Sequence, residues 1–359
     1  MQEIVKEQII ECLKRVDDPD LKKDLVTLGM VKEVDIEGAT VKLNIELTTP
    51  ACPLKDQIKN DIISSIKSVY ADAEIDVNFT ANVKSLSGKN RIAGVKNVIA
   101  VASCKGGVGK STISANLALA LAETGAKVAI LDADVYGPSQ PEIFGVADAK
   151  PVVIESGQML PVRAHGIEIM SIGFFVNRKD AVIWRGPMIG KLLGQFFNDV
   201  LWQDIDYMIL DLPPGTGDTQ ISLSQLIHID GVVMVTTPQN LAVIDVIRGI
   251  EMFKKINVPL LGLIENFSSY SCSKCGHEQK LFTGTGGEDL SSEYGMEFYC
   301  GMPFVKGLSD SQTGSEPFFF DPEADSFKKR ITDVSGRIAA QLSIVNFEEE
   351  SQPKPNPAQ

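Results

Sequence analysis

The fold is decided by one stretch of the sequence, Val98-Ile99-Ala100-Val101-Ala102-Ser103-Cys104-Lys105-Gly106-Gly107-Val108-Gly109-Lys110-Ser111-Thr112. It opens with strand-like residues and continues into a helix-like segment rich in Ala and Leu, Ile113 to Leu121. A strand, a glycine-rich turn and a helix in this order are the setting of a phosphate-binding loop. The glycines let successive backbone N–H groups face a phosphate, and the start of the helix adds partial positive charge. We therefore predict that residues 104–112 bind a nucleotide.

Two lysines in this loop differ in what they can reach. Lys110 is placed to contact the β- and γ-phosphates, and the hydroxyl of Ser111 is placed to bind Mg²⁺. Lys105 stands at the start of the loop and cannot easily reach the far phosphate of its own nucleotide. Lys105 therefore indicates a contact across the interface of a dimer.

From Val98 onward, strand-like and helix-like segments alternate, which predicts a parallel sheet with right-handed crossovers. The predicted strands are 98–103, 128–132, 167–172, 207–211, 232–236, 260–265 and 297–300. The predicted helices are 110–123, 187–201, 218–227, 241–255 and 324–343. The predicted fold class is α/β, with a doubly wound, mostly parallel sheet that carries the phosphate loop.

Acidic side chains end two of these strands. Asp132 and Asp134 close the strand that follows the loop's helix, and Asp211 closes an apolar strand that begins at Tyr207. Because the carboxyl ends of parallel strands face the ligand crevice, we expect carboxylates near the metal and the γ-phosphate. Asp211 is placed like the Walker-B carboxylate, which acts on Mg²⁺ directly or through water. The glycine-containing turn at 213–218 is of a kind that can reorganise with the γ-phosphate.

The chain divides into four parts by composition. Residues 1–84 predict a small α/β (α+β) domain, with helical spacing of apolar residues near 4–16 and 54–69 and alternation at 41–47 and 75–79. Residues 85–97 are polar and predict a linker, and residues 98–345 predict the nucleotide-binding domain. Residues 346–359 are acidic and Pro-rich, which predicts a disordered tail.

A second site is indicated by Cys272-Ser273-Lys274-Cys275. Two residues between the cysteines let both thiolates face one metal centre, and two thiolates are half of a four-thiolate site. No second such pair occurs in the chain, so a complete site needs another copy related by a two-fold axis. A bridging [4Fe–4S] cluster, a zinc ion with His277 as a further ligand, and a redox dithiol all remain open on spacing alone.

Composition limits the function classes. The chain has 359 residues, 44% of them hydrophobic, and a net charge of −13, which disfavours non-specific binding to nucleic acid or anionic lipid. No apolar run approaches the roughly 20 residues of a membrane span. Six cysteines without a disulfide pattern, and an N-terminus without secretory features, lead us to expect a cytoplasmic protein.

The motifs resemble a known family. Cys104–Thr112 is similar to the deviant Walker A loop of the nitrogenase-iron-protein/MinD class of P-loop ATPases. The more specific segments resemble the Mrp/ApbC branch, whose members are iron–sulfur cluster carriers. These are Asp132 to Ser139, Arg185-Gly186-Pro187-Met188, Asp211 to Asp218 and Glu265-Asn266. The family usually has Gly where this chain has Cys104, and we interpret Cys104 as a small buried residue.

The resemblance implies roles residue by residue. Lys105 would contact nucleotide across the dimer, and Lys110, Ser111 and Thr112 would bind phosphate and metal. Asp134 would be the switch residue linked to water and metal, Asp211 the Walker-B carboxylate, and Asn266 a contact to adenine. The C-x-x-C of the family holds a bridging cluster, which favours that interpretation of Cys272 and Cys275.

Residues 1–80 resemble a small domain found in iron–sulfur assembly systems, through Asp18-Pro19-Asp20, Leu28 to Val31 and Leu47 to Pro53. Cys52 lies there between a strand and a helix. A helix N-terminus lowers the pKa of a thiol, so we expect a reactive or metal-binding thiolate.

The resulting prediction is a homodimeric ATPase that uses ATP and Mg²⁺, hydrolyses ATP slowly, binds an iron–sulfur cluster and passes it from an assembly scaffold to apo client proteins. The alternatives are a MinD-like positioning or regulatory ATPase with structural zinc, and an ATP-gated electron-transfer protein. The acidic end of the chain counts against the former, because such proteins end in a basic amphipathic membrane helix.

Overall fold

The computed structural model describes residues 3–86, 88, 90–176, 186–272, 274–275, 277–282, 286–305, 308 and 316–351. Arg185 of the motif named above and residues 352–359 of the expected tail lie outside this part. The chain forms two compact units. One comprises the chain up to Lys84 together with the chain from Ala339 onward, and the other spans Ser85–Ile338.

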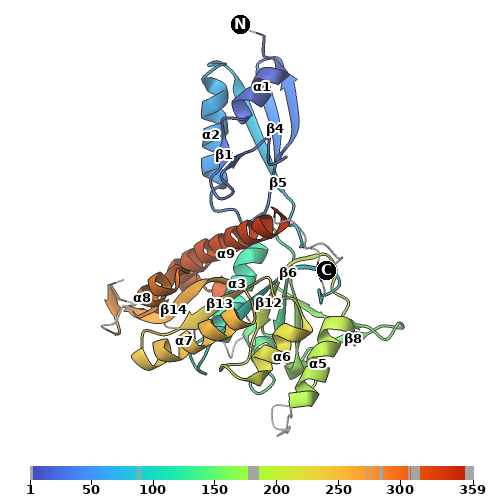
Figure 1. The fold of residues 1–359 in the computed structure, drawn as a ribbon, viewed down its shortest axis with the longest axis vertical. Coiled ribbons are helices and arrows are strands. Elements are labelled where there is room, and N and C mark those ends of the chain that lie inside the picture. Colours follow the sequence, from blue (N-terminus) through green and yellow to red (C-terminus); the bar gives the residue numbers. More distant parts are fainter. Residues whose placement is uncertain are drawn as a thin grey trace, which may run out of the picture. The chain divides into compact units, whose positions relative to one another are not determined.

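The larger unit is built on one sheet, whose strand order is β10-β11-β7-β12-β6-β13-β14-β15, with β16 also paired to β14 (Figure 1). Its strands are β6 (Val95–Ala102), β7 (Val128–Asp132), β10 (Val162–Ala164), β11 (Ile167–Ser171), β12 (Ile205–Asp211), β13 (Gly231–Thr236), β14 (Leu260–Ser271), β15 (Glu278–Lys280) and β16 (Glu297–Phe304). In this spatial order, the strands from β11 to β14 pair in parallel, and so do β14 and β16. Strand β10 pairs antiparallel with β11, and β15 pairs antiparallel with β14. The predicted α/β class with a doubly wound, mostly parallel sheet is confirmed.

Helices lie on both faces of this sheet, as right-handed crossovers require. The helices α5, α6 and α7 lie on one face, and α3 lies on the other (Figure 1). The helices are α3 (Lys110–Glu123), α4 (Gln140–Ile143), α5 (Gly186–Asn198), α6 (Asp218–Leu226), α7 (Asn240–Lys255), α8 (Gly286–Tyr294) and α9 (Asp325–Ser351). The central strands β7 and β13 are buried from end to end, and β12 is buried except at Asp206, because helices cover both of their faces.

The smaller unit is a three-stranded sheet with two helices. Its main elements are α1 (Lys6–Leu13), β3 (Val31–Glu37), β4 (Thr40–Leu47), α2 (Lys55–Lys67) and β5 (Glu74–Ala81), with β1 (Asp17–Asp18) paired to β2 (Lys23–Asp24). The pair β3–β4 is antiparallel and the pair β4–β5 is parallel. The apolar residues that recur along both helices and alternate along β4 meet in one core.

Some boundaries differ from the prediction. Strand β6 begins at Val95, within the expected linker. Helix α9 continues to Ser351, so the prediction of disorder is wrong for residues 346–351. The helix continues because Asn346 is buried in the structure and Phe347 stacks beneath Lys23, whose Nζ lies 4.8 Å from the ring centre. The short hairpin β8 (Val152–Val153) and β9 (Met159–Leu160), like β10, β15 and α8, was not predicted.

The structure has no helix among its described residues that is long and apolar enough to cross a membrane.

Candidate nucleotide site and cysteine hairpin

The glycine loop connects β6 to α3 at the carboxyl end of the sheet. Gly107 and Gly109 have φ angles of 79° and 82°, in the left-handed region that favours glycine. A Cβ on Gly109 would also lie 2.2 Å from Nδ2 of Asn266. That amide donates a hydrogen bond of 2.9 Å to the carbonyl of Val108. The conformation of the loop is therefore fixed by its glycines and by one buried asparagine from β14.

Lys110 is buried among carboxylates. Its Nζ lies 2.6 Å from Asp211 Oδ1 and 4.0 Å from Asp134 Oδ2. It also donates to the hydroxyl of Ser111 at 3.2 Å. The strand ends of β7 and β12 and the start of α3 thus bring together the predicted residues Lys110, Ser111, Asp134 and Asp211.

Asp132 and Asp134 have different environments. Asp132 is buried and accepts hydrogen bonds from the backbone of Ser139 and Gln140 and from the hydroxyl of Ser171. Burial, and then the nearby charge of Asp211, raises the pKa of Asp132 to about 7. Burial also raises the pKa of Asp134, which is closer to Lys110 and keeps slightly more exposure. Asp132 therefore organises the segment after β7, and Asp134 faces the lysine.

This site fits a nucleotide with a divalent cation. Two carboxyl groups pair with one lysine, and a third, that of Asp132, lies nearby, so a cation and a polyphosphate can enter as a charge-balanced pair. Three polar atoms around it are buried without a hydrogen-bond partner among the described residues, namely Oγ of Ser139, Oε1 of Gln140 and Oδ1 of Asn266. Buried polar atoms are seldom left unpaired, so a ligand or its water is expected to pair with them.

Two side chains at this site were missed by sequence reasoning. Ser114 Oγ lies 2.8 Å from Asp211 Oδ1, and Nε2 of Gln140 lies 2.8 Å from Asp211 Oδ2. Ser114 follows Lys110 by one helical turn, so helical spacing could have found it. No comparable signal marks Gln140, because it follows β7 by a loop.

The remaining loop residues face α7. Lys105 Nζ lies 3.2 Å from Asp245 Oδ2 of that helix, and Asp245 also binds Arg248. Cys104 packs against Gly249, where an added Cβ would lie 2.5 Å from its sulfur. Burial raises the pKa of the Cys104 thiol to about 11. Cys104 is thus partly buried against α7, and its interpretation as a small buried residue stays a prediction.

Cys272 and Cys275 lie in the turn between β14 and β15. The backbone N–H of Cys272 donates to the carbonyl of His277 at 2.9 Å, which closes the turn. The backbone N–H groups of Lys274 and Cys275 lower the pKa of the Cys272 thiol, and Cys275 is exposed. Among the described residues, no three His, Cys, Asp or Glu side chains come together as a metal site. Within the described part of one chain, no third such side chain, His277 included, joins the two thiols.

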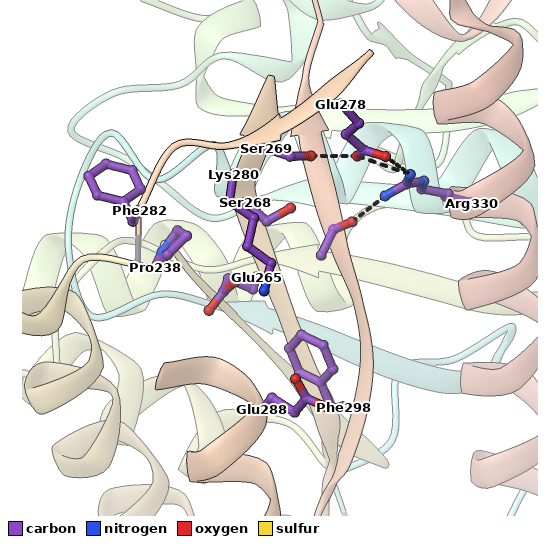
Figure 2. Close-up of a pocket in the computed structure, with 11 residues that line it drawn as sticks. Pro238, Glu265, Ser268, Ser269, Glu278, Lys280, Phe282, Glu288, Phe298 and Arg330 are labelled. Atoms are coloured by element: carbon purple, nitrogen blue, oxygen red, sulfur yellow. Dashed lines mark hydrogen bonds and ion pairs between the residues drawn. The ribbon is translucent and has the colours of Figure 1, made fainter. Parts of the chain in front are cut away.

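The base of this hairpin is tied to α9. Glu278 of β15 accepts hydrogen bonds from Ser269 Oγ at 2.5 Å and from Arg330 Nη2 at 2.9 Å. Arg330 also donates to the carbonyl of Gly301 at 2.8 Å. The bond from Ser269, and then the contact with Arg330, lowers the pKa of Glu278. Figure 2 shows these side chains beside a cavity of about 400 Å³.

Glu265 lies on the wall of this cavity (Figure 2). Its Oε2 accepts a hydrogen bond of 3.0 Å from the backbone N–H of Gly287 at the start of α8. Burial raises the pKa of Glu265. The next residue, Asn266, holds the glycine loop on the other side of the strand. Strand β14 thus connects the nucleotide loop, helix α8 and the cysteine hairpin.

In the smaller unit, Cys52 precedes α2. The N–H of Leu54 lowers the pKa of its thiol, as expected at a helix start, but burial is the larger effect and raises the pKa to about 11. The expectation of a lowered pKa at Cys52 is therefore wrong, because desolvation of the thiolate outweighs the backbone donor.

A parallel sheet with this glycine loop and these strand-end carboxylates defines a P-loop nucleotide-binding protein. Residues 94–339 match the family described as NUBPL iron-transfer P-loop NTPase, and residues 6–77 match the iron–sulfur cluster assembly protein family. The chain belongs to the NUBPL iron-transfer P-loop NTPase family.

Similar proteins extend this likeness to most of the chain. The iron–sulfur cluster carrier protein of Haemophilus influenzae is 38% identical over 349 residues, which cover 95% of this chain and 94% of that protein. The iron–sulfur cluster transfer protein NUBPL of Dictyostelium discoideum is 40% identical over 306 residues, covering 84% and 95%. A nucleotide-binding protein from Archaeoglobus fulgidus, solved with ADP, is 35% identical with a TM-score of 0.58, covering 66% of this chain and 93% of that one.

Proposed function

We propose that this protein binds and slowly hydrolyses ATP with Mg²⁺, and that a pair of subunits carries a [4Fe–4S] cluster to apo client proteins. The proposal joins the two sites described above, and the likeness to cluster carrier and transfer proteins supports it.

One observation supports the coupling most strongly. Strand β14 contacts the glycine loop through Asn266 and, six residues later, ends at the cysteine hairpin at Cys272. The segment between these two points is only six residues long and contains a β-bulge, where the pairing of β14 with β16 shifts register between Glu265 and Ser269 and Phe267 has a φ of 56°. A change in the loop on nucleotide binding is therefore expected to reach the thiols.

The chain's own residues divide the nucleotide work. Lys110 would leave Asp211 to bind phosphate, Ser111 and Asp211 would hold Mg²⁺, and Asp134 would orient water. Bound Mg²⁺ would neutralise phosphate charge. Thr112 and the backbone of the loop would bind the phosphates, and Asn266 would stand near the base. Lys105 would exchange Asp245 for the nucleotide of the partner subunit.

The cluster is treated as cargo. Cys272 and Cys275 supply two thiolates, and the exposed position of Cys275 leaves room for a second copy of the hairpin. Two copies would supply the four thiolates of a [4Fe–4S] site. The lowered pKa of Cys272 favours the thiolate form that binds iron.

The test is anaerobic purification and reconstitution with iron and sulfide, followed by metal and sulfide analysis and a UV–visible spectrum. We expect about four irons and four sulfides per two chains, following the four-thiolate count. Cys272→Ser should abolish the cluster, whereas Cys300→Ser should retain it, since burial raises the pKa of the Cys300 thiol to about 11. Colourless protein with stoichiometric zinc after reconstitution would contradict the proposal.

A further inference from the structure

Gln140 begins α4 and is completely buried, yet its side chain is polar. Its Nε2 donates to Asp211 Oδ2 at 2.8 Å and to the carbonyl of Ser111 at 3.1 Å. Both partners only accept hydrogen bonds here, so the amide nitrogen must face them and the amide oxygen must face away.

The oxygen of this amide has no partner. Oε1 of Gln140 is buried and without a hydrogen bond among the described residues. A buried amide oxygen without a donor is costly, and an apolar side chain of similar size would avoid that cost. The polar side chain of Gln140 is therefore explained if its amide nitrogen positions the carboxylate of Asp211. Its amide oxygen would then accept a hydrogen bond, for example from water, when the nucleotide site is occupied.

The contacts of Asp211 indicate what Gln140 does. Asp211 Oδ1 contacts Lys110 and Ser114, whereas Oδ2 contacts Gln140. If Lys110 moves to a phosphate, Oδ1 loses its cation, and Gln140 still holds Oδ2. The hydrogen bonds from Gln140 to Oδ2 and from Ser114 to Oδ1 then set the plane of the carboxylate, and only that from Gln140 comes from outside α3.

The backbone of the same residue reaches a second carboxylate. The N–H of Gln140 donates to Asp132 Oδ2 of β7 at 3.1 Å, and its side chain bonds Asp211 of β12 and the carbonyl of Ser111 in α3, so one residue ties the segment after β7 to these three elements. Movement of the segment after β7 would therefore rotate the carboxylate of Asp211.

We propose that Gln140 is a positioning residue, which orients Asp211 for Mg²⁺ and links that carboxylate to the segment after β7. This inference rests on the proposed nucleotide function, and it assigns the Mg²⁺ dependence of binding to a residue outside the glycine loop and the strand-end carboxylates.

The test measures nucleotide affinity rather than turnover. A fluorescent ATP analogue is titrated into the full-length protein in excess Mg²⁺ and in EDTA. Gln140→Leu fills a similar volume without the hydrogen bond to a charged group, so we expect the Mg²⁺-dependent gain in affinity to fall about tenfold. The affinity in EDTA should fall by less than this, because the bond to the carbonyl of Ser111 is lost in both conditions, whereas the bond to Asp211 matters to Mg²⁺ alone. Gln195→Leu, on an exposed position of α5, is the matched control and should behave as wild type.

A second variant tests whether Gln140 acts through its hydrogen bond to Asp211 or only through the volume of its side chain. Gln140→Glu keeps the shape, and its carboxyl group can donate to Asp211 only when it is protonated. As a carboxylate it supplies no donor to Asp211, so Gln140→Glu should lose at least as much of the Mg²⁺-dependent gain as Gln140→Leu although it keeps the shape.

Two results would overturn the inference. One is an unchanged Mg²⁺-dependent gain in Gln140→Leu with normal thermal unfolding. The other is an equal loss in Mg²⁺ and EDTA for both variants, which would mean that Gln140 only shapes the pocket. If wild type itself binds the analogue no better in Mg²⁺, the proposed nucleotide function fails, and that outcome is distinct because it needs no variant.

Discussion

At the scale of single residues, the nucleotide site places carboxylates that can bind a cation next to the lysine that can bind phosphate. Lys110 is held by Asp211 and approached by Asp134, so carboxylates that could bind a cation also retain the phosphate-binding lysine. Removing Lys110 would leave the carboxylate of Asp211 buried without its cation, which costs about 3–5 kcal/mol. These side chains are therefore arranged for ligand exchange, in which a phosphate and a cation together replace the ion pairs between Lys110 and the carboxylates.

Gly109 gives a prediction about the loop. Gly109→Ala should lower the free energy of unfolding by about 1–3 kcal/mol, because alanine at this positive φ is strained and its Cβ meets Asn266. Gly106→Ala is the matched control, since no atom lies within 4 Å of its added Cβ. Chemical unfolding of both variants would measure the difference. Equal unfolding free energies would show that the backbone here is not under this constraint.

The thiols give a prediction about pH. The pKa of Cys272 is lowered from 9.0, whereas burial raises that of Cys52 and Cys104 to about 11. Since the thiolate is the reactive form, alkylation of Cys272 in the metal-free protein should reach half its limiting rate below pH 9.0. Cys52 and Cys104 should stay largely unmodified there, as followed by peptide mass spectrometry. Faster labelling of Cys52 than of Cys272 would reverse the assignment.

At the scale of elements, the hairpin that carries the cysteines is short and polar, so its position depends on contacts at its base. Strand β15 has only exposed residues and pairs with β14 alone. Ser269, Glu278 and Arg330 replace the apolar packing that the hairpin lacks. The orientation of Cys272 and Cys275 is therefore set by a charge-assisted network rather than by a core.

This network gives a prediction about cluster retention. Arg330→Met should speed cluster loss to a chelator several-fold, about the effect of one hydrogen bond to a charged group, and Arg330→Lys should restore little because it lacks the planar fork. Lys328→Met is a control on the same helix, where Lys328 pairs with Glu123. Loss of the cluster's visible absorbance gives the rates. Identical rates in all variants would mean that the base of the hairpin does not position the thiols.

The sequence predicted long, apolar elements best. Strand β7 and helix α3 occur at the predicted residues, since each combines a clear apolar pattern with a glycine or acidic end signal. Strand β15 and helix α8 were missed because they are short and polar, and their stability comes from partners distant in sequence such as Arg330 and Glu265. Gln140 was missed for the same reason, because only the folded chain brings it to Asp211.

At the scale of the whole molecule, the chain combines two kinds of chemistry in its larger unit and a further small unit that matches an iron–sulfur assembly family. Lys105 and the single C-x-x-C pair each call for a second subunit, by independent arguments. The proposed dimer would thus share both nucleotide contacts and cluster ligands. The central claim is that the nucleotide site governs the cluster.

Cluster transfer from reconstituted protein to an apo acceptor, followed anaerobically with and without ATP and Mg²⁺, tests this claim most directly. We predict that nucleotide changes the transfer rate of wild type, and that Lys110→Ala and Asp134→Ala retain the cluster but lose this response. Lys328→Met should respond as wild type does. Equal transfer rates with and without nucleotide in wild type, or an unchanged response in Lys110→Ala and Asp134→Ala, would contradict the coupling.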